Sequence, residues 1–133
     1  MSHENVEIAK RATDALNCRD WETFYRLITP DFEWLPAMPG LVQDVGYKGR
    51  EEFGAYVVEA EETWEYLRAI MDEFRDLGDR VLVLGRMEGR GRAGGVPVET
   101  PVAELMEFRG GKLARDRVFL DHDAALRAAG LEE

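Results

Sequence analysis

TPVAELMEFRGGKLARDRVFLD, residues 100–121, is the stretch that decides the fold, because its pattern is typical of a long antiparallel hairpin. Gly110 and Gly111 supply a two-residue turn, in which positive φ angles cost glycine little. If Arg109 and Lys112 flank this turn, residues whose numbers add up to 221 face each other across the two strands. Paired side chains then share one face of the hairpin, because side chains alternate along a strand.

This register predicts one mostly apolar face with Glu104 opposite Arg117 at its centre. The other pairs on that face are Phe108 with Leu113, Met106 with Arg115, Val102 with Phe119, and Thr100 with Asp121. The opposite face carries Ala103, Leu105, Glu107, Asp116, Val118 and Leu120. An apolar wall with a few converging polar groups is typical of a ligand pocket. The sequence therefore predicts a small-molecule pocket in which Glu104 and Arg117 form the central polar pair.

The elements around the hairpin indicate an α+β fold in a single domain spanning residues 1–133. Apolar residues at helical spacing predict helices over 2–16, 20–28, 50–67 and 124–129. Alternating and apolar runs predict strands over 31–35, 69–77, 80–90, 96–108 and 112–120. Segment 37–46 contains proline and glycine and is expected to be a loop, either over the surface or at a pocket mouth. Helices followed by an antiparallel sheet are typical of the α+β class.

Composition and charge exclude several classes of partner. The chain has 27 acidic and 17 basic residues, a net charge of −10, which disfavours binding to nucleic acid or to an anionic membrane. No apolar run approaches the ~20 residues of a membrane span, and the N-terminus has no apolar signal core. We therefore expect a cytoplasmic protein whose partner is a small apolar or aromatic molecule.

The sequence gives no motif for a metal or a nucleotide cofactor. Cys18 is the single cysteine, and with only His3 and His122 no zinc-ligand spacing can be written. Residues 89–94, GRGRAG, match the dinucleotide pattern literally, but that pattern requires a helix to begin there. Residues 96–101, VPVETP, instead have a β pattern with two prolines. We therefore expect a hairpin loop at this point and no cofactor.

The order and spacing of several short motifs resemble those of the SnoaL-like branch of the nuclear transport factor 2-like superfamily. The matching pieces are DW at 20–21, PDFEW at 30–34, YKGREE at 47–52, LGDRV at 77–81, EFRGGK at 107–112 and VFLD at 118–121. The resemblance implies a cone-shaped fold, in which a curved antiparallel or mixed sheet wraps around N-terminal helices and encloses an apolar pocket. It also implies a homodimer formed through the sheet.

The resemblance further implies acid–base chemistry without a cofactor. The superfamily includes polyketide cyclases, ketosteroid isomerases, limonene-epoxide hydrolases and scytalone dehydratases, together with members that only bind. Its enzymes place an Asp, Glu or His in the apolar pocket. Asp121 matches the acid that polyketide cyclases carry near the end of the last strand. Glu104, Arg117 and Asp121 loosely match the Asp–Arg–Asp arrangement of the epoxide hydrolases.

Each candidate residue also has a plain structural explanation. Glu104 and Arg117 are either an acid or base tuned by a cation, or a cross-strand ion pair. Asp121 is either a base at the pocket rim or the N-cap of the last helix. Arg115 is expected at the pocket or its mouth. The expected apolar walls, each of which could equally be core, are Trp34, Tyr47, Tyr56, Trp64, Met106 and Phe119.

Two classes of function remain open at this point. The first is a cofactor-independent isomerase, cyclase or hydrolase that acts on a polyketide-, steroid- or terpene-like substrate through these catalytic carboxylates. The alternative is a non-catalytic domain, which either binds such a ligand or serves as a structural dimer.

Overall fold

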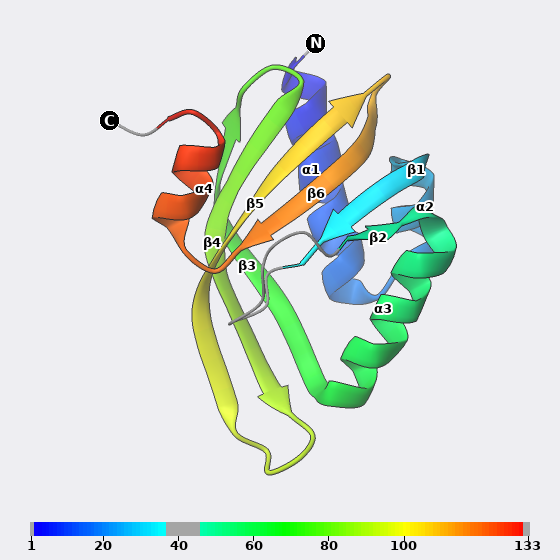
Figure 1. Cartoon of the computed structure of the whole chain (residues 1–133), viewed down its shortest axis with the longest axis vertical. Coiled ribbons are helices and arrows are strands. Elements are labelled where there is room, and N and C mark those ends of the chain that lie inside the picture. The colour runs from blue at the N-terminus through cyan, green and yellow to red at the C-terminus, as the bar shows by residue number, and fades with distance from the viewer. Residues whose placement is uncertain (1, 37–45, 132–133) are drawn as a thin grey trace.

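A curved, unclosed six-stranded sheet with helices on both faces forms the protein (Figure 1). The structure is a computed structural model that describes residues 2–36 and 46–131. The elements in chain order are α1 (Ser2–Cys18), α2 (Trp21–Leu27), β1 (Ile28–Leu35), β2 (Tyr47–Lys48), α3 (Gly49–Thr63), β3 (Trp64–Asp76), β4 (Arg80–Gly91), β5 (Pro97–Arg109), β6 (Lys112–Phe119) and α4 (His122–Ala128). The predicted α+β class is confirmed.

The sheet has the strand order β2-β1-β6-β5-β4-β3. Its neighbours are antiparallel except for β1 and β6, which are parallel. This parallel contact joins the N-terminal half of the chain to the centre of the sheet. It brings Trp34 of β1 beside Asp116 of β6, two residues that are far apart in the sequence.

Two apolar clusters hold the helices to the two faces of the sheet. The inner-face cluster packs α1, α2 and α3 against strand residues that include Val81, Val83, Val102 and Met106. The outer-face cluster packs α4 against the alternate residues, which are Leu82, Leu84, Ala103, Leu105 and Phe119. Figure 1 shows α1 behind the sheet and α4 on the opposite side. Strand alternation therefore gives each face its own core.

Local signals explain where the first helices begin and end. The side chain of Asp20 accepts a hydrogen bond from the backbone N–H of Thr23 at 3.2 Å and caps α2, as expected. The expected extension of the third helix to residue 67 is wrong. Instead α3 ends at Thr63, and Trp64 begins β3, where it pairs with Gly91 of β4. Pairing with β4 outweighs the helical spacing of the apolar side chains in residues 64–67. As a result, β3 begins five residues before the strand predicted over 69–77.

The predicted register of the β5–β6 hairpin is correct at the turn and wrong beyond it. Arg109 pairs with Lys112 and Phe108 with Leu113, as expected. A β-bulge then shifts the register by one residue, so that Glu107 pairs with Arg115. A shift of one residue reverses the face of every following side chain. The distal half of β6 therefore presents Asp116 and Val118 to the inner face.

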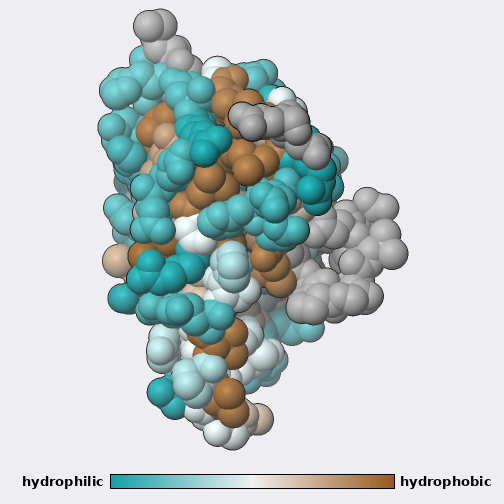
Figure 2. Space-filling view, turned by 90° about the vertical axis from the view of Figure 1, so that its left-hand side faces the viewer, coloured by the Kyte–Doolittle hydropathy of each residue, from teal (hydrophilic) through white to brown (hydrophobic). Residues whose placement is uncertain are grey.

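The segment that matches the dinucleotide pattern is a hairpin loop, as the sequence predicts. Gly89 and Gly91 lie in β4, and the chain then turns into β5 without a helix. Figure 2 shows hydrophobic surface at the tip of this hairpin, where Val96 and Val98 are 63% and 40% exposed. Apart from Gly46, the expected loop at 37–46 lies outside the described residues. Within the described part of the chain, no helix is long and apolar enough to cross a membrane.

Candidate functional site

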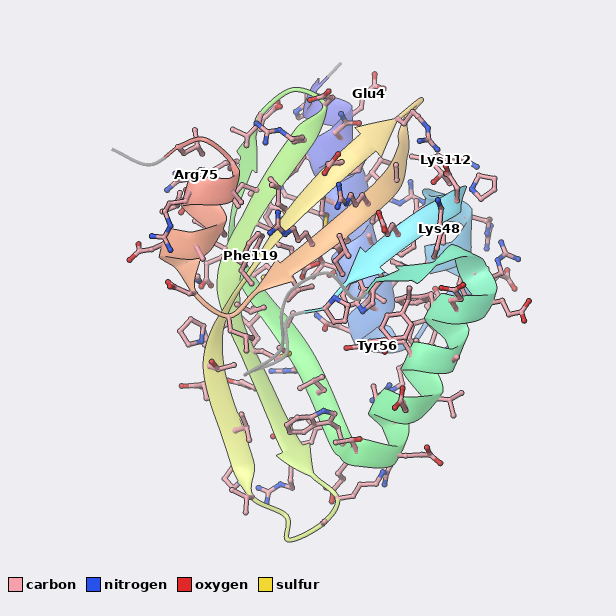
Figure 3. The ribbon with its side chains drawn as sticks, in the orientation of Figure 1. Glu4, Lys48, Tyr56, Arg75, Lys112 and Phe119 are labelled. Carbon is pink, nitrogen blue, oxygen red and sulfur yellow. The ribbon has the colours of Figure 1, made fainter. Side chains whose placement is uncertain are left out.

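A pocket of about 170 Å³ lies between the helices and the inner face of the sheet. The buried bottom of the pocket includes Phe53, Val102 and Glu104. Figure 3 shows the Tyr56 side chain directed from α3 toward the strands. The remaining lining residues are Leu16, Asn17, Arg19, Trp21, Trp34, Pro36, Val57, Ala60, Trp64, Leu67, Arg68, Ala69, Met87 and Val118. Most of this lining is apolar, so the pocket suits a largely apolar molecule.

Aromatic rings from β1 and α3 form one wall of the pocket. The ring centroid of Trp34 lies 5.6 Å from that of Phe53 and 5.7 Å from that of Tyr56. Tyr47 contacts the ring of Tyr56 at 5.1 Å but does not line the pocket. These offset and edge contacts fix the positions of the Trp34 and Tyr56 rings.

A buried carboxyl pair lies at the sheet side of this pocket. Glu104 of β5 is 6% exposed and lines the pocket, whereas Asp116 of β6 is fully buried. In the shifted register Glu104 pairs with Val118, so Asp116 is its diagonal neighbour on the same face. Long side chains reach such diagonal neighbours across two strands. Asp116 therefore lies behind Glu104, with Trp34 and Met106 as its register partners on either side.

Burial raises the proton affinity of both carboxyl groups. Burial raises the pKa of Glu104, against a smaller lowering by its hydrogen bond with Asp116. Burial, the negative charge of Glu104 and their mutual hydrogen bond hold the pKa of Asp116 well above its usual range. No basic side chain among the described residues forms an ion pair with either group. Two adjacent carboxylates cannot both ionise readily, so the pair retains a proton above the usual range for carboxyl groups.

The two acids differ in which one keeps its proton and which one lines the pocket. Burial and the neighbouring Glu104 hold the pKa of Asp116 well above its usual range, so Asp116 is the group of the pair that keeps its proton. The Oε1 atom of Glu104 has no hydrogen-bond partner. Glu104 is thus a carboxyl group in the pocket lining with one buried oxygen that has no hydrogen-bond partner.

Two further polar groups belong to the aromatic wall. Burial raises the pKa of Tyr56, the indole of Trp34 lowers it, and the charges of Tyr47 and Glu104 raise it further. The Glu104 carboxylate therefore lies within electrostatic reach of the Tyr56 hydroxyl. The buried indole Nε1 of Trp34 has no partner with full hydrogen-bond geometry.

The structure does not bring Arg117 to Glu104, so the expected central pair is wrong. Because of the bulge, Arg117 lies on the outer face, where its guanidinium lies 4.9 Å from the ring centroid of Phe119. Arg115 also faces outward, with its Nε 3.3 Å from a Glu33 carboxylate oxygen and its Nη1 3.7 Å from one of Glu107. The register predicted from the sequence would have placed Arg115 and Arg117 on a buried face. Arginine is rarely buried without a partner, and this was the signal in the sequence against that register.

Three of the six expected wall residues line the pocket, namely Trp34, Tyr56 and Trp64. Met106 is fully buried in the core beside Asp116, and Phe119 packs against α4 on the outer face. Tyr47 and Arg115 also lie outside the pocket lining.

Asp121 lies outside the pocket lining and caps α4. Its Oδ1 accepts a hydrogen bond from the backbone N–H of Asp123 at 2.9 Å. Of the two roles expected for Asp121, the structure therefore shows the helix N-cap. Over the described residues, no group of three or more His, Cys, Asp or Glu side chains is arranged to hold a metal ion.

Comparisons with known proteins place this geometry in a family. The sequence profile of the SnoaL-like domain matches residues 9–116, whereas no curated protein matches the sequence. An NTF2-like protein of unknown function from Burkholderia pseudomallei K96243 superposes with a TM-score of 0.79 at 21% identity, over 93% of this chain and 95% of that one. TerC, crystallised with polyporic acid, gives 0.78 at 23% identity, over 91% and 94%.

A protein from Jannaschia sp. CCS1 with the provisional name SnoaL-like polyketide cyclase gives a TM-score of 0.74 at 21% identity, over 95% of this chain and 91% of that one. These identities are low, so the structural matches show the fold, which is the expected NTF2-like cone. The profile match covers most of the sequence, and the chain therefore belongs to the SnoaL-like domain family.

Proposed function

We propose that this protein binds a small apolar carbonyl compound in the pocket and transfers a proton on it without a cofactor. The observation that carries the proposal is the Glu104–Asp116 pair, a buried carboxyl pair on an apolar pocket wall. Burying two acids without a cation disfavours folding, and such perturbed groups in clefts are typical of acid–base sites.

The proposed chemistry assigns separate roles to the two acids. The Glu104 carboxylate removes a proton from the carbon next to the carbonyl, and the electron pair of the broken C–H bond forms an enolate. The protonated Glu104 then returns that proton to the same or another carbon, which is the net reaction of an isomerase. Asp116 donates its hydrogen bond to Glu104 and orients it, so it acts as a positioning residue.

The test is hydrogen exchange on a defined ketone. 2-Tetralone, a two-ring ketone with acidic C–H groups, is incubated with the protein in D₂O, and loss of its α-proton signal is followed by NMR. Wild type is expected to accelerate exchange, and Glu104→Gln to reduce that acceleration by about 10²–10⁴-fold, the usual contribution of a general base. Glu99→Gln, which changes an exposed glutamate of the same strand, is the matched control.

Equal exchange by wild type and Glu104→Gln would contradict the proposal. Tight binding of 2-tetralone without accelerated exchange would favour the second candidate, a non-catalytic binding domain. The predominantly apolar lining of the pocket is the observation that favours this alternative.

A further inference from the structure

The aromatic wall holds a buried hydrogen-bond donor, the indole Nε1 of Trp34. Trp34 is 9% exposed, its Nε1 atom is buried, and it lines the pocket. The indole interacts with the Tyr56 hydroxyl and affects its pKa, yet the contact does not reach hydrogen-bond geometry. A buried donor without a good acceptor is destabilising by about 1–3 kcal/mol and calls for an explanation.

Trp34 and Glu104 belong to the lining of the same pocket. Trp34 pairs with Asp116 in the parallel β1–β6 contact, and Asp116 is the diagonal neighbour of Glu104. Both Trp34 and Glu104 line the pocket, one from each side of Asp116. A ligand in the pocket therefore lies beside both the Trp34 side chain and the Glu104 side chain.

The size of the pocket limits the ligand. An apolar protein cavity of about 150 Å³ holds a benzene molecule. The pocket here has a volume of about 170 Å³, which suits one ring or a compact pair of fused rings. A four-ring steroid skeleton exceeds this space.

We propose that the pocket selects one- or two-ring ketones, whose carbonyl oxygen accepts a hydrogen bond from Trp34 Nε1–H while Glu104 faces the adjacent carbon. The inference deepens the proposed function and rests on it for the role of Glu104. It assigns Trp34 as the residue that recognises the carbonyl, with the Tyr56 hydroxyl as its neighbour on the same wall.

Matched ligands and matched variants test this assignment by isothermal titration calorimetry. The ligands are 2-tetralone and 2-methylenetetralin, in which a CH₂ group replaces the carbonyl oxygen. We expect wild type to prefer the ketone by about fivefold, the effect of one net hydrogen bond. Trp34→Phe keeps an aromatic ring but removes the donor, so the two ligands should then bind equally. Trp64→Phe, which changes another tryptophan of the lining, should alter both affinities alike and leave their ratio unchanged.

A second readout keeps the assignment testable if Trp34→Phe fails to fold. In ¹⁵N-labelled wild type, the indole N–H resonance of Trp34 should shift on addition of 2-tetralone and stay in place with 2-methylenetetralin. The inference is overturned if wild type binds both ligands equally, if neither ligand binds, or if Trp34→Phe retains the preference. Binding of androstenedione as tight as that of 2-tetralone would overturn the size limit.

The same samples separate the inference from the proposed function. If Trp34→Phe loses the preference while Glu104→Gln exchanges α-protons as fast as wild type, the ligand assignment stands and the proton-transfer role fails. If wild type accelerates exchange but Trp34→Phe retains the preference, the proton-transfer role stands and the ligand assignment fails.

Discussion

At the scale of single residues, Asp116 is the group on which the candidate site depends. It is fully buried, has no basic partner among the described residues, and its pKa is held well above the usual range by burial and by Glu104. A buried charge is tolerated only when something compensates for it, and here that compensation is the retained proton. The pair should therefore destabilise the fold at high pH while it equips the pocket with a carboxylate.

Replacing Asp116 should stabilise the protein at neutral and alkaline pH. In the unfolded chain both carboxyls release their protons near their usual pKa, whereas in the folded protein both retain them to higher pH. The stability that these protons provide is complete below the unfolded pKa and is lost as the pH rises through the folded pKa. We expect Asp116→Asn to raise the stability above pH 7 by about 1–2 kcal/mol and to flatten its pH dependence.

Urea unfolding between pH 4 and pH 9 measures this effect. Glu99→Gln, on an exposed part of the same sheet, should follow the wild-type curve. A variant less stable than wild type at every pH would mean that Asp116 is a structural requirement of the fold.

At the scale of elements, the β-bulge determines which residues of β6 reach the pocket. The Gly110–Gly111 turn and the first two pairs of the hairpin were predictable, because turn chemistry is local. The bulge depends on the curvature of the complete sheet and on the parallel contact with β1. Sequence reasoning therefore located Glu104 but assigned Arg117 as its partner in place of Asp116.

Long-range pairing also explains the other differences from the sequence prediction. Residues 64–67 continue a helical apolar pattern, and only the partner strand β4 determines that they form a strand. Trp34 and Tyr56 were expected as pocket walls from their residue type, and they line the pocket. The proximity of Trp34 to Asp116 depends on the β1–β6 contact, which no local pattern announces.

Gly85 in β4 is the glycine at which an added methyl group should destabilise the fold most. A Cβ atom there would lie 2.1 Å from the carbonyl oxygen of Ile70 and 2.7 Å from the Cα of Met71, both backbone atoms of the adjacent strand. The β3–β4 register shifts just beyond Met71, so the two strands approach closely at this point. We expect Gly85→Ala to destabilise the fold by about 3 kcal/mol, the upper range for overpacking.

Thermal unfolding of Gly85→Ala and of Gly91→Ala checks this expectation. At Gly91 of the same strand, the nearest atom to an added Cβ would be the carbonyl oxygen of Ala93 at 3.8 Å, an ordinary contact. Equal melting temperatures for the two variants would show that the strands can separate at Gly85 without loss of stability.

At the scale of the whole molecule, the homodimer expected from the family resemblance stays a prediction. The helix α4 packs over only part of the outer face (Figure 1). The outward side chains of β4 include Arg86, which lies 3.5 Å from Glu88 and 3.7 Å from Glu99. The side chains of Arg86 and Glu99 are 43% and 66% exposed.

We expect sedimentation velocity to give a mass of twice 15.1 kDa for the wild type. Arg86→Glu would place three acids together on the outer face and should shift the protein toward the monomer, because like charges across an interface repel. Arg11→Glu, on the exposed surface of α1, should leave the mass unchanged. A monomeric wild type, or equal dissociation of both variants, would contradict a dimer through the sheet.

The measurement that tests the central claim most directly is a ¹³C NMR titration of the Glu and Asp side-chain carboxyls. The claim is that Glu104 and Asp116 share a proton on the wall of the pocket. The account predicts two coupled carboxyl resonances that titrate above the usual range, and a single altered one in Asp116→Asn. Titration of every carboxyl within its ordinary range, unchanged in the variant, would contradict it.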